Sequence, residues 1–148
     1  MVAMGGNSIS PKDKIGTIQE QFKNTRETLD AISHFINRDY NLCINHGNGP
    51  QVGDELLRMD LTYKEVPPLP LGMCVAGTQG TIGYMIQQSL QNKLRDLNID
   101  REVVTMVTQV IVDANDPEIK TPKKFIGKRY IKEEAFRLSK LFNWTVKE

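Results

Sequence analysis

The sequence has no excess of charge of either sign. Its 148 residues carry 19 lysines and arginines against 18 aspartates and glutamates, which gives a formal net charge of +1 at pH 7. Nucleic acids and acidic membrane surfaces attract proteins that project a strong basic field. Neither is therefore an expected partner of this chain.

A secretory leader and a long apolar run are also missing. No basic region followed by an apolar stretch comes after Met1, so no signal peptide is expected. The most apolar stretch, Val103 to Val112, is interrupted by three polar residues and is far shorter than the roughly 20 residues of a membrane-spanning helix. We therefore expect a cytoplasmic protein without a membrane partner.

Cysteine is scarce. Cys43 and Cys74 lie in apolar stretches and do not have the spacing of metal ligands. We interpret them as buried, reduced thiols, which agrees with a cytoplasmic location. No metal ligand is assigned from the sequence.

Standard nucleotide motifs are absent as well. No P-loop pattern occurs, and the stretch from Gly47 to Gly53 is one residue too long for the dinucleotide fingerprint. The segment from Gly80 to Gly83 matches the GxxG loop of KH domains, which bind RNA. Because no basic residues flank this segment, we favour close packing of a helix start against the sheet or a second subunit.

Hydrophobic periodicity indicates strands that alternate with helices. Strands are predicted at Val2–Met4, Asn41–Ile44, Val103–Val112 and Trp144–Val146, and helices over Ile15–Ile36, from about Pro50, over Thr78–Leu97 and over Glu133–Phe142, with loops at Val66–Leu71 and Asp113–Pro122. This alternation is typical of an α/β fold with a parallel sheet, and the length suits one domain.

Two glycine turns are the candidate site. Gly5-Gly6-Asn7 and Gly47-Asn48-Gly49 each follow a predicted strand, and ligands of open α/β sheets bind beyond the carboxyl ends of the strands. Glycine has no Cβ, so backbone N–H groups can approach an oxyanion, and a helix N-terminus adds unpaired donors. Together the turns would form an anion cradle. The alternative is that both are only tight turns.

Three further charged or titratable residues have plainer interpretations. His46 adjoins the second turn, and we interpret it as an anchor of that turn rather than as a catalytic base. On the residues alone, Lys123 and Lys124 are interpreted as a solvated pair in a loop. The functional alternative is a point charge brought to a phosphoryl group.

Five blocks of the sequence resemble carbamate kinase, of the amino-acid kinase superfamily. The blocks are Met4–Asn7, His46–Gly53, Ala76–Gln87, Thr108–Pro117 and Lys124–Gly127, and they follow one another in the family's order. The resemblance implies a three-layer αβα sandwich with a mostly parallel sheet, truncated in this chain. It also implies reversible phosphoryl transfer between carbamoyl phosphate and ADP, giving ATP and carbamate. The family's members are cytosolic homodimers that often serve arginine fermentation.

The resemblance also implies roles for single residues. Carried over position by position, the residues that hold carbamate or carbamoyl phosphate would be Gly5, Gly6, Asn7, Gly47, Asn48 and Gly49. Lys124 would be the catalytic lysine that neutralises phosphoryl charge. Residues 1–122 would form the substrate-binding domain, and residues 123–148 would begin a protruding subdomain that is cut short.

Several features depart from the family's pattern. Asn45 stands where threonine is usual, Gly72 stands where aspartate is usual, and Lys123 and Phe125 flank Lys124 in place of threonine and proline. The family's C-terminal half, which holds ATP or ADP with Mg²⁺, would be absent, so the chain alone is expected to be inactive. It would act with a second copy or with a missing C-terminal half. The alternative is a non-catalytic anion-binding or dimerisation module left from a truncated kinase.

Overall fold

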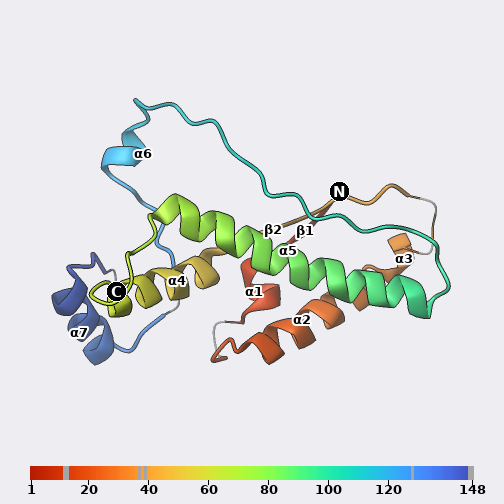
Figure 1. Cartoon of the computed structure of the whole chain (residues 1–148), viewed down its shortest axis with the longest axis horizontal. Coiled ribbons are helices and arrows are strands. Elements are labelled where there is room, and N and C mark those ends of the chain that lie inside the picture. The colour runs from red at the N-terminus through yellow and green to blue at the C-terminus, as the bar shows by residue number, and fades with distance from the viewer. Residues whose placement is uncertain (12–13, 37, 39, 128, 147–148) are drawn as a thin grey trace.

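The structure, a computed structural model, describes residues 1–11, 14–36, 38, 40–127 and 129–146 (Figure 1). The elements in chain order are β1 (Val2–Met4), α1 (Gly6–Ile9), α2 (Ile18–Ala31), α3 (Ser33–Ile36), β2 (Ile44–His46), α4 (Gly49–Thr62), α5 (Leu71–Asp96), α6 (Pro117–Lys120) and α7 (Lys132–Phe142). None of the helices in the described ranges is long and apolar enough to cross a membrane.

The sheet is a parallel pair of strands. Met4 of β1 lies opposite His46 of β2, so both strands end at the same edge, as the α/β prediction requires. Helices cover the face to which Met4 points, whereas Ala3 and Asn45 on the opposite face are exposed. The described residues therefore supply the sheet and one helical layer of the predicted sandwich.

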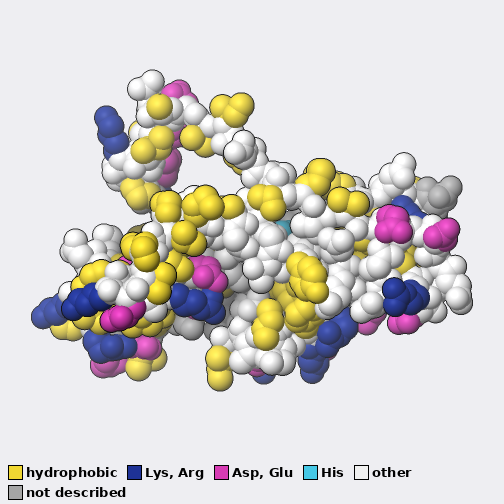
Figure 2. Space-filling model, in the orientation of Figure 1, with side chains coloured by type: hydrophobic (Ala, Val, Ile, Leu, Met, Phe, Trp, Pro, Cys, Tyr) yellow, Lys and Arg dark blue, Asp and Glu magenta, His cyan; other side chains and the backbone are white. Residues whose placement is uncertain are grey.

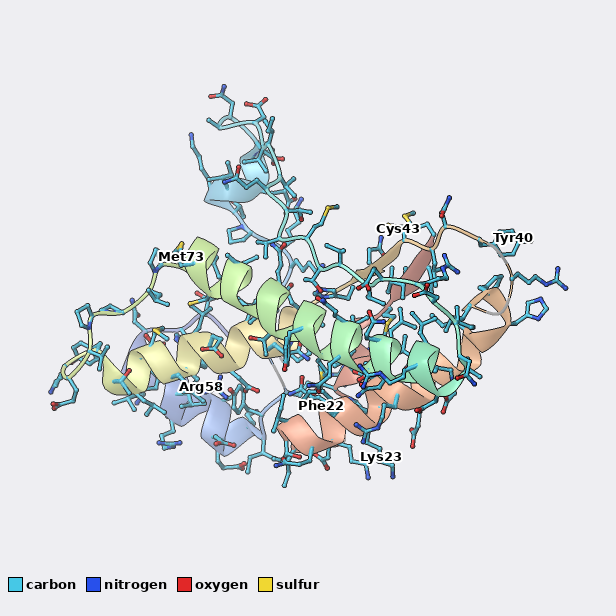
Figure 3. All side chains as sticks on the ribbon, turned by 45° about the vertical axis from the view of Figure 1, so that its right-hand side comes forward. Phe22, Lys23, Tyr40, Cys43, Arg58 and Met73 are labelled. Carbon is cyan, nitrogen blue, oxygen red and sulfur yellow. The ribbon has the colours of Figure 1, made fainter. Side chains whose placement is uncertain are left out.

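Two apolar clusters join this sheet to α2 and α5. One contains Met4, Ile9, Ile82, Met85 and Ile86, and the other contains Leu29, Ile32, Ile36, Leu90 and Leu94. On α2, Phe22 points toward the first cluster, whereas the next residue, Lys23, points away from it (Figure 3). Burying one such apolar side chain contributes about 1.5–3 kcal/mol, so these clusters hold both helices against the strands.

Helix α2 ends earlier than the periodicity predicted, and it begins with a capping box. The predicted helix over Ile15–Ile36 is divided at Ile32 into α2 and α3. Thr17 accepts a hydrogen bond from the N–H of Glu20, and the Glu20 carboxylate accepts from the N–H of Thr17 at 2.9 Å. The bond from the Thr17 backbone is the main cause that lowers the pKa of Glu20 below its usual value of 4.5.

This capping box predicts a loss of helix in acid. A carboxyl group whose pKa is depressed in the folded state stabilises that state above its unfolded pKa, and the contribution is lost as the pH falls through the folded pKa. Lowering the pH from 7 to below 4 should therefore fray the start of α2. Circular dichroism should show a smaller acid-induced loss of helix in Glu20→Gln, which carries no titrating carboxyl group. An equal loss in both proteins would contradict this prediction.

Helix α5 is longer than predicted and includes the GxxG segment. The structure starts this helix at Leu71, seven residues before the predicted start at Thr78. The Gly80–Gly83 segment therefore lies inside a helix and does not form the loop of a KH domain. A Cβ added at Gly83 would lie 2.3 Å from the Thr105 methyl carbon. Glycine at this position therefore leaves room for the extended segment around Thr105 to cross α5. Close packing is found at Gly83, but against the extended segment at Thr105 and inside the helix, not at a helix start against the sheet as predicted.

The predicted strand at Val103–Val112 is wrong. The segment is extended and runs back along α5 toward α6, but it joins no sheet (Figure 1). A cavity of about 180 Å³ is lined both by its first residues, Val103 to Met106, and by Ile44 and His46 of β2. Its exposed apolar residues, visible along this segment in Figure 2, are Val104, Met106, Val107, Val110, Ile111 and Val112.

Two glutamines of α5 hold this extended segment instead of a neighbouring strand. Gln91 donates to the carbonyl of Arg101 at 3.0 Å and accepts from the N–H of Val103 at 3.1 Å. Gln79 accepts from the N–H of Thr108 at 2.9 Å and donates to its carbonyl at 3.3 Å. We call these two side chains the glutamine clamps, because each one occupies both a donor and an acceptor of the backbone.

The C-terminal part of the described chain packs on α4. Helix α7 is confirmed within one residue of its prediction, and Asn143 ends it in the left-handed conformation. The predicted strand at Trp144–Val146 is wrong, because Trp144 instead turns back and donates from Nε1 to Asp60 of α4 at 2.8 Å. This contact attaches the end of the chain to the helix that follows the second glycine turn.

Candidate anion site

The structure brings the two glycine turns together. Each turn follows one strand of the parallel pair, and the N–H of Gly47 donates to the carbonyl of Met4 at 3.2 Å. A Cβ on Gly47 would lie 3.6 Å from the backbone nitrogen of Gly6, so the turns are in van der Waals contact. The expectation that they are neighbours at the carboxyl edge of the sheet is confirmed.

The second turn opens a long helix. Asn48 is the N-cap of α4, Gly49 is its first residue and Pro50 follows within the first turn, as predicted for the start near Pro50. The N-terminus of a 14-residue helix presents unpaired N–H groups and about half a positive charge. This helix start therefore has an intrinsic attraction for an anion.

Space above the turns is open at two glycines. A Cβ added at Gly5 or Gly49 would meet no atom within 4 Å, whereas one at Gly6 would lie 3.4 Å from the Pro50 ring. Asn7 is exposed, and Asn48 is half-buried beneath α5. A small ligand can therefore reach the backbone of both turns from solvent.

The segment from Lys124 to Gly127 reaches the same edge. Gly127 donates its N–H to the carbonyl of Gly49 at 3.0 Å, and a Cβ on Gly53 would lie only 2.1 Å from the Cα of Gly127. Three residues span at most about 11 Å, so the backbone of the exposed Lys124 lies within that distance of Gly127, which bonds to the second turn. Its neighbour Lys123 is paired with Glu118, whereas Lys124 has no ion-pair partner among the described residues.

His46 remains attached to its own turn. Its Nδ1 lies 3.3 Å from the carbonyl oxygen of Gly47, as the interpretation of an anchoring residue expects. Within the described ranges, no group of three or more histidine, cysteine or acidic side chains could hold a metal ion. The described residues of the candidate site are backbone donors and a lysine.

Sequence reasoning missed two contributors to this site. Thr78 of α5 accepts a hydrogen bond from the Asn48 side chain at 3.0 Å, and Gly53 lets the chain at Gly127 approach α4. The only sequence signal for Thr78 is a polar residue at a position that helical periodicity buries. The Gly53 contact joins residues far apart in sequence, and no local pattern indicates it.

Carbamate kinases match the chain from end to end. The carbamate kinase of Pyrococcus horikoshii is 44% identical over 150 residues, which cover 100% of this chain and 48% of the relative. The carbamate kinase from Giardia lamblia bound to citric acid superposes with a TM-score of 0.92 at 32% identity, over 98% of this chain and 47% of that one. The Giardia enzyme bound to AMP-PNP gives a TM-score of 0.81 at 32% identity, over 99% of this chain and 47% of that one.

These relatives confirm the resemblance found in the sequence and the predicted carbamate-kinase-like fold. No family model matches the chain. The chain spans about half the length of the curated relatives it matches.

Proposed function

We propose that the chain carries the carbamoyl-phosphate side of a carbamate kinase site, and that the paired glycine turns hold the phosphoryl group. One observation carries the proposal: the Gly47 N–H bonds to the Met4 carbonyl, so both turns meet at one edge, where α4 begins. The homology to carbamate kinases along the whole chain supports the same assignment.

The residues of the site meet most of the chemical requirements of this reaction. The phosphoryl group leaves the carbamoyl oxygen, which keeps the electron pair as carbamate, and bonds to the terminal oxygen of ADP. Carbamate is already an anion, so no general base is needed, in agreement with the attachment of His46 to its own turn. Such transfer depends on positioning and charge stabilisation, which backbone donors and Lys124 would supply.

The nucleotide side of the reaction would need a second half like that of the carbamate kinases. We propose that residues 1–122 form the substrate-binding domain and that residues 123–148 begin a protruding subdomain. As the resemblance to carbamate kinase implies, ADP or ATP and its Mg²⁺ would be held by a nucleotide-binding C-terminal half. The full protein would be a cytoplasmic homodimer of arginine metabolism, and this chain alone would be inactive.

Inorganic phosphate tests the site without requiring catalysis. Titration into the isotopically labelled chain should shift the backbone amide signals of Gly5, Gly6, Gly47 and Gly49 together, with one affinity. The chain alone should form no ATP from carbamoyl phosphate and ADP. Amide shifts without turnover, even after a separately expressed C-terminal half of a relative is added, would favour a non-catalytic anion-binding module. Unchanged glycine signals would refute the cradle.

Lys124 gives a prediction with a neighbouring control. Lys124→Ala should weaken phosphate binding about tenfold, because a hydrogen bond between charged groups contributes roughly 1.5–3 kcal/mol. Lys123→Ala removes the same charge from the adjacent position, where the lysine pairs with Glu118, and should change the affinity less than threefold. Equal effects of the two variants would mean that Lys124 contributes only through the net charge of the chain and not through contact with phosphate.

A further inference from the structure

The cap residue of α4 is turned away from its own helix. Asparagine at an N-cap usually accepts a hydrogen bond from the second or third N–H of its helix. Asn48 makes no such bond, and its Nδ2 instead donates to Oγ1 of Thr78 on α5 at 3.0 Å. The amide that would ordinarily cover the start of α4 is thus held by a neighbouring helix.

The Thr78 hydroxyl defines how that amide is held. Thr78 is 3% exposed, and its Oγ1 donates to the carbonyl of Val75 at 2.8 Å. Because the single hydroxyl proton is used in this bond, Oγ1 meets Asn48 as an acceptor, and the amide must present its NH₂ group. The orientation of the Asn48 side chain therefore follows from the buried Thr78 hydroxyl.

The diversion of Asn48 leaves the helix start uncapped by any side chain. The second residue of α4, Pro50, has no N–H, so the donor that a capping oxygen would take is the N–H of the third residue, Gln51. We propose that Thr78 is a positioning residue of the phosphate site: it draws the Asn48 amide to α5 and keeps the Gln51 N–H at the start of α4 available to the anion. This inference rests on the proposed function.

Thr78→Val tests the inference, because valine has the shape of threonine without the hydroxyl. The Asn48 amide is then released to cap α4. We expect inorganic phosphate to bind about tenfold more weakly, while the unfolding midpoint of the chain falls by no more than a few degrees. Thr78→Ser keeps the hydroxyl and should bind phosphate within twofold of the parent chain.

A second threonine on the same helix provides the control. Thr81 is exposed and its hydroxyl bonds to the carbonyl of Gly77, so Thr81→Val removes an equivalent bond and should leave the affinity unchanged. The Asn48 side-chain amide signal should move in Thr78→Val and not in Thr81→Val. Should Thr78→Val not fold, Thr78→Ala carries the same comparison.

The outcomes separate the two proposals. Failure of the parent chain to bind phosphate overturns the proposed function itself. Phosphate binding by the parent chain and by Thr78→Val within twofold overturns only the role of Thr78. Loss of affinity in both Thr78→Val and Thr78→Ser, in step with a lower unfolding midpoint, would mean that Thr78 is merely structural and would also overturn the inference.

Discussion

Replacing Gly53 with alanine is expected to destabilise the chain by about 3 kcal/mol or more, at the upper end of overpacking effects. The new Cβ would lie 2.1 Å from the Cα of Gly127 and 2.8 Å from its backbone nitrogen. Both are backbone atoms, and Gly127 is fixed by its bond to Gly49 and by a φ of +89°. Neither side can yield without separating the 124–127 segment from α4.

Thermal unfolding measures this effect. For a domain of this size each kcal/mol corresponds to roughly 2–4 °C, so Gly53→Ala should unfold about 6–12 °C lower than the parent chain. Gly77→Ala is the control, because a Cβ there meets no atom within 4 Å and alanine favours a helix by about 1 kcal/mol. Unfolding of Gly53→Ala within 2 °C of the parent chain would show that the backbones are not in contact.

Replacing Gly49 with aspartate should abolish phosphate binding without harming the fold. A Cβ at Gly49 points into open space, and a carboxylate in the first turn of a helix is favoured by the helix dipole. The same carboxylate would stand beside the bound anion. Two unit charges 4 Å apart repel by about 4 kcal/mol at an effective dielectric constant of 20, so affinity should fall more than a hundredfold.

Gly72 offers the matched control for that charge. It lies in the first turn of α5, is exposed and also has no atom within 4 Å of an added Cβ. Gly72→Asp should therefore add the same charge to a helix start and leave the phosphate affinity within threefold. Isothermal titration with phosphate compares the two variants. Equal losses would point to the net charge of the chain rather than to contact at α4.

The fold could be predicted where local sequence determines it. The apolar period of α7 located both ends of that helix within one residue, and Pro50 located the start of α4. Val103–Val112 has the composition of a buried strand, but a strand also needs a neighbouring backbone to pair with, and this segment bonds to the side chains of Gln79 and Gln91 instead. Composition alone cannot say whether such a partner lies close enough.

Part of the candidate site could likewise be predicted from local sequence, and part could not. The two glycine turns follow from their places at the ends of parallel strands, so their proximity could be predicted from the sequence. The importance of Lys124 came from the resemblance, since a lysine in a loop has no local pattern of its own. Thr78 and the contact of Gly53 with Gly127 depend on how α5 and the 124–127 segment cross α4, which only tertiary structure reveals.

The glutamine clamps also set which changes of chain length the protein tolerates. Gln79 and Gln91 are 12 residues apart on a helix, about 18 Å, and they bind the N–H groups of Thr108 and Val103, five extended residues or about 17 Å apart. Deleting one residue between the glutamines would rotate one clamp by about 100° away from the segment. Insertions and deletions should therefore be excluded from both stretches, yet accepted in the loop between Val112 and Pro117.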